Sequence, residues 1–274
     1  MKKLIVIADW ADDRLARQEY RSATEGNLKD PSFPNITYVS STPSTIHTGF
    51  ITAQIVEVEE ALGRPHDTII FQNTDPRLQT ETHVERSQGA EFAVLRLKSG
   101  ILLCGPNAGY DFSFIRHKIE RAYIYRGMNA GSQFRSRDLY SRVCAHLMDN
   151  MQDELELEDV GAAAIPQLTG YHVGHIDSYG NIKTTIRQSD LKGKYELGDD
   201  IHIRLNGIDK KAKYVSNLFG GEIGELVIYP GSSGAKDDLF LEVSIWRHFD
   251  DHVFGTGQHE FNNPRPGMQI EITG

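Results

Sequence analysis

Short apolar runs alternate with an amphipathic stretch in the first part of the chain. Residues 4–8, 36–39 and 68–73 form compact apolar runs, and residues 46–62 between the last two show helical spacing. This alternation is typical of strand-helix-strand units with parallel pairing. The pattern therefore predicts a mostly parallel sheet with helices packed on it.

Two later segments extend this prediction. The runs 91–97 and 101–105 flank Lys98-Ser99-Gly100, so we expect an antiparallel hairpin in the same sheet. A helix is expected from Ser136 to about Met151, where apolar side chains recur at helical spacing. Its buried face would carry Leu139, Val143, Leu147 and Met151.

Strand-like runs recur at short intervals after Pro166, with no convincing helical pattern between them. They cover residues 171–177, 181–186, 200–205, 211–216, 224–229, 239–246 and 268–272. This spacing is typical of a small β-barrel or sandwich. We therefore predict an α/β N-terminal domain with a mostly parallel central sheet, residues 1–165, and an all-β, barrel-like C-terminal domain, residues 170–274.

The composition is that of a globular protein. Of 274 residues, 39% are hydrophobic and 24% are charged, and no apolar run approaches the ~18 residues that a membrane span needs. The net charge of -9 argues against a general nucleic-acid binder. The two cysteines, Cys104 and Cys144, favour buried thiols in a protein of the reducing cytoplasm.

The richest chemistry lies in HVGHIDSYGNIKTTI, residues 172–186. Asp177 accepts hydrogen bonds from an ammonium or hydroxyl group, Tyr179 offers a π-face, and Asn181 both donates and accepts. Together these groups suit a nucleoside. The simpler alternative is a tight turn between two strands, for which Asp-Ser-Tyr-Gly-Asn is ordinary chemistry.

Five further stretches stand in register with this one. They are IADWADD, TDPR, GPNAGYDFSFI, SQFRSRDLYSRVCAHL and GEIGELVIYPGSSG. With them the chain resembles the S-adenosyl-L-methionine hydroxide adenosyltransferases, whose relatives include a fluorinase and a chlorinase that use halide in place of water. The resemblance implies a homotrimer, with the substrate between the N-terminal domain of one subunit and the C-terminal domain of its neighbour, and no added cofactor.

The resemblance also implies how the nucleoside is bound. Asp9 would accept hydrogen bonds from the ribose hydroxyls, although an Asp at a strand end also begins a turn or caps a helix. Tyr179 would pack on the adenine and Asn181 would hydrogen-bond to it. Trp246 lies near the strand that borders the adenine, where it would equally serve as a core or trimer-interface aromatic.

The methionine end would be bound by two other side chains. Asp177 matches the carboxylate that accepts from the ammonium group, and Ser232 matches a Ser that holds the carboxylate. The chain departs from its relatives here, because Ser233 follows where the fluorinase has Arg and Ser44 replaces a frequent aromatic. The ligand is therefore expected to be gripped differently.

The implied reaction is attack of water at C5′, which releases adenosine and L-methionine. Asp75 in TDPR matches the carboxylate that handles the water. The Arg of the regular pattern is missing, so we assign its role to Arg86, with Arg77 as the alternative. Arg135 stands where the hydrolases have His, and it stays protonated, so it cannot act as a base.

Ser136 suggests a second chemistry. The fluorinase has Ser at this point, whose hydroxyl and N–H hold a halide, and the neighbouring Arg135 would add positive charge. Asp75 opposes this, since a carboxylate repels an anion. Ser136 would alternatively cap a helix. The missing His leaves a third possibility, a protein that binds S-adenosylmethionine or adenosine without turnover.

No residue set fixes the base or a metal. His47, His83 and His117 are candidates for the base, and the sequence does not bring any of them to the site. His248 and His252 have the i, i+4 spacing of a helical metal pair, but the segment is strand-rich and lacks a third ligand. We therefore expect no metal.

Overall fold

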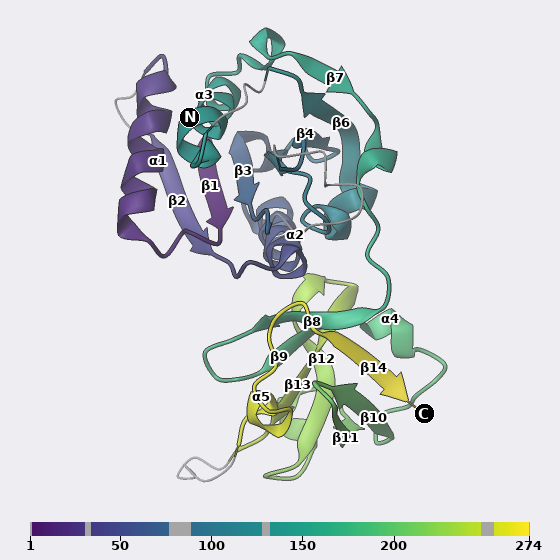
Figure 1. Cartoon of the computed structure of the whole chain (residues 1–274). Coiled ribbons are helices and arrows are strands. Elements are labelled where there is room, and N and C mark those ends of the chain that lie inside the picture. The colour runs from purple at the N-terminus through teal and green to yellow at the C-terminus, as the bar shows by residue number, and fades with distance from the viewer. Residues whose placement is uncertain (1, 31–33, 77–88, 128–131, 248–254, 274) are drawn as a thin grey trace. The chain divides into compact units, whose positions relative to one another are not determined.

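The computed structural model describes residues 2–30, 34–76, 89–127, 132–247 and 255–273. The chain divides into two compact units, Met1–Leu168 (unit 1) and Thr169–Gly274 (unit 2), which Figure 1 shows with most of their elements labelled. None of the helices in these ranges combines the length and apolar character needed to cross a membrane.

Unit 1 contains a seven-stranded sheet in the order β2-β1-β3-β5-β4-β6-β7. Strands β2, β1, β3 and β5 run parallel, and β4, β6 and β7 add antiparallel pairs. The bounds are Lys3–Ala8 (β1), Asn35–Ser40 (β2), Thr68–Asn73 (β3), Phe92–Leu97 (β4), Leu102–Pro106 (β5), Ile119–Tyr125 (β6) and Leu157–Asp159 (β7). The predicted α/β class, its parallel strands and the antiparallel hairpin are confirmed.

Helices cover both faces of this sheet because its central strands are apolar on both sides. On β1, Leu4 and Val6 pack in one core cluster with Tyr20 of helix α1, Arg14–Asn27, and Val143 of helix α3, Ser141–Met148. The intervening residues of β1 pack in the opposite cluster with helix α2, Thr45–Leu62. Successive residues of a strand face opposite sides, so one short strand contributes to two cores.

Helix α1 did not stand out in the sequence pattern. Of its 14 residues only Tyr20 and Thr24 are buried, so it has almost no apolar stripe. Its start is fixed instead by Asp13, whose carboxylate accepts from the N–H groups of Leu15 and Ala16.

The helix expected from Ser136 to Met151 is shorter and less regular than predicted. Ser136–Tyr140 forms a π-helical turn, and α3 ends at Met148. Asn150 has a φ of 58°, which ends the helix and leaves Met151 outside it. Val143 and Leu147 are buried as expected.

Unit 2 is a closed barrel in the order β10-β11-β12-β13-β9-β8-β14, which confirms the predicted barrel-like class. The bounds are Tyr171–Ile176 (β8), Ile182–Arg187 (β9), Asp200–Leu205 (β10), Ile208–Tyr214 (β11), Leu226–Ala235 (β12), Asp238–Ile245 (β13) and Gln269–Thr273 (β14). Two helices that the sequence pattern did not predict, Gln188–Leu191 (α4) and Gly257–Glu260 (α5), have only four residues each. Short 3-10 turns lie at Pro65–Asp67, Ser113–Lys118, Gln152–Glu154, Ala162–Ala164 and Leu218–Gly220.

Gly105 in β5 tests how tightly the central strands of unit 1 approach each other. It has a φ of 150°, and a Cβ placed there would lie 2.0 Å from the carbonyl oxygen of Gln72 in β3. We expect Gly105→Ala to lower the free energy of unfolding by at least about 3 kcal/mol, measured by chemical unfolding. Gly26→Ala is the control, since a Cβ there has no atom within 4 Å and Ala favours a helix. Equal stability of the two variants would contradict this packing.

Candidate functional site

The carboxyl ends of the parallel strands bring two of the assigned residues together. Ala8 at the end of β1 pairs in register with Asn73 at the end of β3, so Asp9 and Asp75 follow neighbouring strands at the same edge. Strand β2, which follows β1 in the chain, pairs on one side of β1. Strand β3, which follows β2, pairs on the opposite side of β1, so the strand order reverses between β1 and β3. Ligands of open α/β sheets bind at such switch points. Asp9 and Asp75 stand on its two sides.

Asp9 lies in the turn after β1, as the simpler sequence reading held, and it does not cap α1, whose cap is Asp13. The residue is exposed, yet the surrounding atoms partly desolvate its carboxyl group and raise its pKa. The N–H groups of Asp9 and Trp10 lower the pKa, and the charge of Asp75 raises it.

Asp75 is held beside a guanidinium group. Its Oδ2 accepts from the N–H of Ala90 at 3.1 Å. A Cβ on Gly89, which has a φ of 72°, would lie 2.6 Å from Asp75 Oδ2 and 2.5 Å from Arg135 Nη1. The fold therefore brings Asp75 and Arg135 to the same backbone position, and Gly89 leaves room for both.

Ser136 is buried and its hydroxyl accepts a hydrogen bond from Asn73 Nδ2. It begins the π-helical turn, whose cap position is Arg135, without a side-chain capping bond. The helix-cap alternative for Ser136 is therefore wrong. The structure instead ties Ser136 to the end of β3, two residues before Asp75.

A buried hydroxyl network that the sequence did not reveal supports this edge. Thr74 Oγ1 lies 2.7 Å from Thr48 Oγ1 and 3.2 Å from Ser41 Oγ. His47 is also buried, and its Nδ1 accepts from the N–H of Thr42 at 3.0 Å. These groups come from the loop after β2, from helix α2 and from the loop after β3, so no local sequence pattern predicts that they meet.

Asp111, in the loop after β5, is a second residue that the sequence did not single out. Its side chain is 1% exposed, and neither carboxyl oxygen has a hydrogen-bond partner among the described residues. Burial raises its pKa well above the ordinary value, and the charges of Asp75 and Asp9 raise it further.

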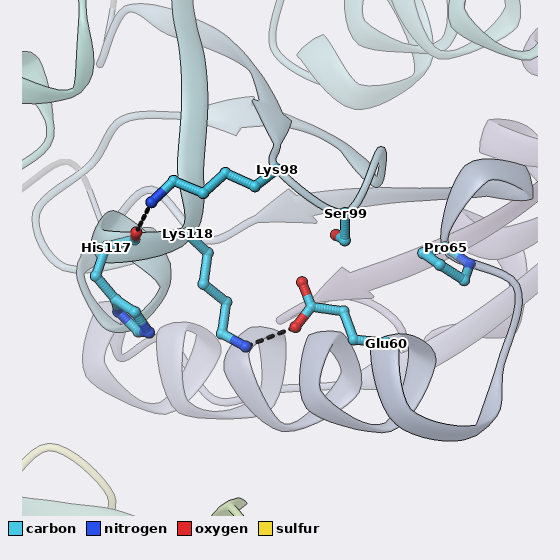
Figure 2. A pocket seen from close by; sticks show the side chains of 6 residues that line it. All are labelled: Glu60, Pro65, Lys98, Ser99, His117 and Lys118. Atoms are coloured by element: carbon cyan, nitrogen blue, oxygen red, sulfur yellow. Dashed lines mark hydrogen bonds and ion pairs between the residues drawn. The ribbon is translucent and has the colours of Figure 1, made fainter.

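The candidate bases and cations do not all join this edge. His117 lines a separate hollow of about 540 Å³ beside the Lys118–Glu60 ion pair (Figure 2). Pro65 and Ser99 also line it, and they lie at the opposite, amino edge of β3 and β5. Arg77, His83 and Arg86 fall in residues 77–88, and His248 and His252 in residues 248–254, outside the described residues. Within the described ranges no cluster of acidic, His or Cys side chains is arranged for a metal.

In unit 2, the turn between β8 and β9 is organised by Asp177. Its Oδ1 accepts from the N–H groups of Tyr179 at 2.9 Å and Asn181 at 3.0 Å, and its Oδ2 accepts from Asn181 Nδ2 at 2.9 Å. Asn181 Oδ1 accepts from the hydroxyl of Ser244. The simpler reading of this segment as a tight turn is therefore right. Tyr179 is 69% exposed.

Ser232 belongs to an ion-pair cluster. Its N–H and hydroxyl donate to Glu242 Oε1 at 2.9 and 3.1 Å, and Lys183 Nζ lies 2.7 Å from its Oγ. Lys183 and Glu242 form an ion pair at 2.8 Å, with side chains 15% and 7% exposed. Sequence reasoning missed both, because they lie 59 residues apart on neighbouring strands.

A tyrosine and a histidine interact with this cluster. Burial, and then Glu242, raise the pKa of Tyr229, whose hydroxyl lies 3.3 Å from Glu242 Oε2. Burial, and then Lys183, lower the pKa of His175. Trp246 follows β13 and packs edge-on against Phe219, with ring centroids 5.9 Å apart.

The chain is similar to proteins of one enzyme family. Residues 171–245 match the family model of the SAM hydroxide adenosyltransferase C-terminal domain. A protein of Methanocaldococcus jannaschii named (R)-S-adenosyl-L-methionine hydrolase is 34% identical over 161 residues, which are 55% of this chain and 57% of that protein. The match thus spans little more than half of this relative's length. The predicted resemblance is confirmed over the segments that these matches cover.

Solved structures support the fold. A crystal structure of an uncharacterized conserved protein from Thermotoga maritima has a TM-score of 0.67 at 17% identity, and it covers 98% of this chain and 100% of that one. A conserved hypothetical protein from Thermus thermophilus has a TM-score of 0.62 at 15% identity, with 100% of both chains covered.

The Lys183–Glu242 pair leads to a prediction for unit 2. Glu242→Ala would leave a largely buried ammonium group without its counter-ion, and we expect it to lower the free energy of unfolding by about 3 kcal/mol. Chemical unfolding followed by tryptophan fluorescence measures this. Glu271→Ala is the control, since Glu271 lies 4.0 Å from Arg204 with both side chains about half exposed, and we expect a change below about 0.5 kcal/mol. A Glu242→Ala protein as stable as this control would contradict the prediction.

Proposed function

We propose that this chain is a SAM hydroxide adenosyltransferase that hydrolyses S-adenosyl-L-methionine to adenosine and L-methionine. The observation that carries the proposal is the position of Asp75, beside Arg135 and across the switch point from Asp9. The match of residues 171–245 to the family's C-terminal domain and the similarity to a named hydrolase support it.

The chemistry asks little of the leaving group. The sulfonium sulfur of the substrate departs as a neutral thioether, so the barrier lies in the nucleophile. An active site lowers that barrier by aligning the attacking water opposite the C5′–sulfur bond and by removing the hydrogen bonds of that water to other solvent molecules. Asp75 would hold this water, with Arg135 orienting the carboxylate and Arg86 as the further cation of the site.

Water is a better candidate nucleophile than halide. Asp9 and Asp75 place negative charge at this edge, and the charges of both raise the pKa of the buried Asp111 after the effect of burial. Such a site repels an anion before it loses its water shell. A halide-using transferase is therefore the second candidate, and a non-catalytic binder the third.

Binding of the nucleoside is proposed for four residues. Asp9 would accept from the ribose hydroxyls, a role that its partial solvent access supports. Tyr179 would stack on the adenine with its exposed ring, and Trp246 would border it. Asn181 would hydrogen-bond to the adenine by exchanging its bond with Ser244.

The methionine end would bind to the polar cluster of unit 2. Asp177 would accept from the ammonium group with the lone pairs that its turn leaves unused. Ser232 would donate to the carboxylate, and Lys183 at 2.7 Å from its hydroxyl would supply positive charge.

We also propose a homotrimer with its sites at subunit interfaces, without an added cofactor and without nucleic-acid or membrane partners. The net charge of -9 supports the absence of a nucleic-acid partner. A cytoplasmic location is supported by two buried, free thiols, Cys104 and Cys144, whose sulfurs lie 3.7 Å apart.

Incubation of the purified protein with S-adenosylmethionine, followed by chromatography, tests the activity. Adenosine supports hydrolysis. Formation of a 5′-halo-adenosine only in the presence of halide would favour the halide-using transferase. Binding of S-adenosylmethionine without any product would favour the non-catalytic binder.

Asp75→Asn tests the assigned role of the carboxylate. Asn keeps the acceptor for Ala90 and loses the charge that acts on water, so we expect kcat to fall by about 100-fold or more with nearly unchanged affinity. Steady-state kinetics and calorimetric titration measure the two effects. Parallel loss of binding and rate would show that Asp75 holds the substrate instead.

Asp177→Ala tests the ammonium partner. We expect the affinity for S-adenosylmethionine to fall about 10-fold to 100-fold more than that for adenosine, which lacks the ammonium group. Asp177→Asn is the matched variant, because its amide oxygen still accepts from the N–H groups of Tyr179 and Asn181. An unchanged ratio of the two affinities in the Asn variant would rule out the role.

A further inference from the structure

Asp111 is a buried carboxyl group that the reaction described above does not use. It is 1% exposed, and both of its carboxyl oxygens lack a hydrogen-bond partner among the described residues. Buried polar groups are normally paired, and an ionised carboxylate left unpaired costs several kcal/mol. Such a group suggests a partner that arrives with a ligand.

One turn of helix α2 places Asp111 near the nucleophile site. Thr48 Oγ1 lies 2.7 Å from Thr74 Oγ1, and Thr74 directly precedes Asp75. A Cβ on the next residue, Gly49, would lie 3.2 Å from the carbonyl oxygen of Asp111. Two consecutive residues of α2 therefore touch the segments that carry the two carboxyl groups.

The charges around Asp111 are mostly negative. Asp75 and Asp9 act on it and, after burial, raise its pKa. Two basic residues of this region contact other groups: Arg135 lies beside Asp75, and His47 Nδ1 accepts a hydrogen bond from the N–H of Thr42.

The basic groups of the following turn have partners elsewhere. Arg116 Nε donates to the carbonyl of Ile165 at 3.1 Å, and Lys118 pairs with Glu57 and Glu60. His117 lines the hollow at the opposite edge of the sheet. No described cation bonds to Asp111, and burial, together with the charges of Asp75 and Asp9, holds the pKa of its carboxyl group well above the ordinary value.

We propose that Asp111 is the proton acceptor of the reaction: it ionises when the sulfonium substrate binds, and it takes the proton of the attacking water. This inference rests on the proposed hydrolysis. The oxygen of water forms a bond to C5′, and the electron pair of the C5′–sulfur bond passes to sulfur. One proton of the water passes to Asp111, and the products are adenosine and methionine.

The substrate's charge would control this proton transfer. A cation near a carboxyl group favours the ionised form, so binding of the sulfonium releases the proton of Asp111 to solvent. Cleavage converts the sulfonium into a neutral thioether, which removes that cation and makes the carboxylate a stronger base. Asp111 thus regains its proton as the water loses one.

Two readouts on the wild-type protein test this cycle. Calorimetric titration in buffers of different ionisation enthalpy should show about one proton released on binding S-adenosylmethionine and none on binding S-adenosylhomocysteine, which lacks the sulfonium charge. The fall of kcat/KM toward acid pH should lie at higher pH than that of kcat, because the free protein binds the proton more tightly than the complex. Equal proton release with both ligands, or coincident acid limbs, would overturn the proposal.

Asp111→Asn provides the matched variant. Asn resembles the uncharged carboxyl group, so the fold should persist, while kcat falls about 100-fold or more and the acid limb of kcat disappears. Asp149→Asn, the same change at the amino edge of the sheet, is the control and should keep full activity. If the wild type produces adenosine and the Asp111→Asn protein is equally active, the role of Asp111 is wrong while the proposed hydrolysis stands. Absence of adenosine from the wild type would instead overturn the proposed hydrolysis.

Discussion

The in-register pairing of β1 with its two parallel neighbours is the constraint on which unit 1 depends. Ala8 aligns with Ser40 of β2 and with Asn73 of β3, so the segments after these three strands emerge side by side. Parallel strands need crossovers, and these cover the sheet with helices on both faces. A shift of one residue in this register would turn the apolar sets of β1 toward the wrong helices and separate Asp9 from Asp75.

Electrostatics gives this edge its chemical character. Burial raises the pKa of Asp9 and of Asp111, and the charge of Asp75 raises both further. The site therefore favours a ligand that carries positive charge, as a sulfonium nucleoside does. The same arrangement separates two kinds of carboxyl group: Asp75 is bonded to a backbone N–H and lies beside a guanidinium, while Asp111 is buried without a partner among the described residues.

In the barrel, the residues assigned to the ligand also hold the fold. Asp177 closes the β8–β9 turn, and Glu242 accepts from Ser232 and Lys183. A ligand's ammonium and carboxylate would join groups that are already ordered. Such preorganisation lowers the entropy lost on binding, because the side chains are fixed before the ligand arrives.

The sequence by itself determined the architecture and the local motifs. Strands of alternating or continuous apolar residues, the hairpin at Lys98-Ser99-Gly100, and the Asp-Ser-Tyr-Gly-Asn turn depend on neighbours within a few residues, and their patterns are readable. Helix α1 was not predicted because its two buried residues make too weak an apolar pattern. Helix α3 ends earlier than predicted because Asn150 takes a positive φ.

The tertiary structure alone decided which distant groups meet. Arg135 and Asp75 meet beside Gly89, Lys183 pairs with Glu242 on the neighbouring strand, and Asp111 is buried with no hydrogen-bond partner in the described part of the chain. Each of these facts depends on the register between strands and on what covers a side chain. Neither quantity is written in the spacing of residues along the chain, because both arise from packing between segments that are far apart in sequence.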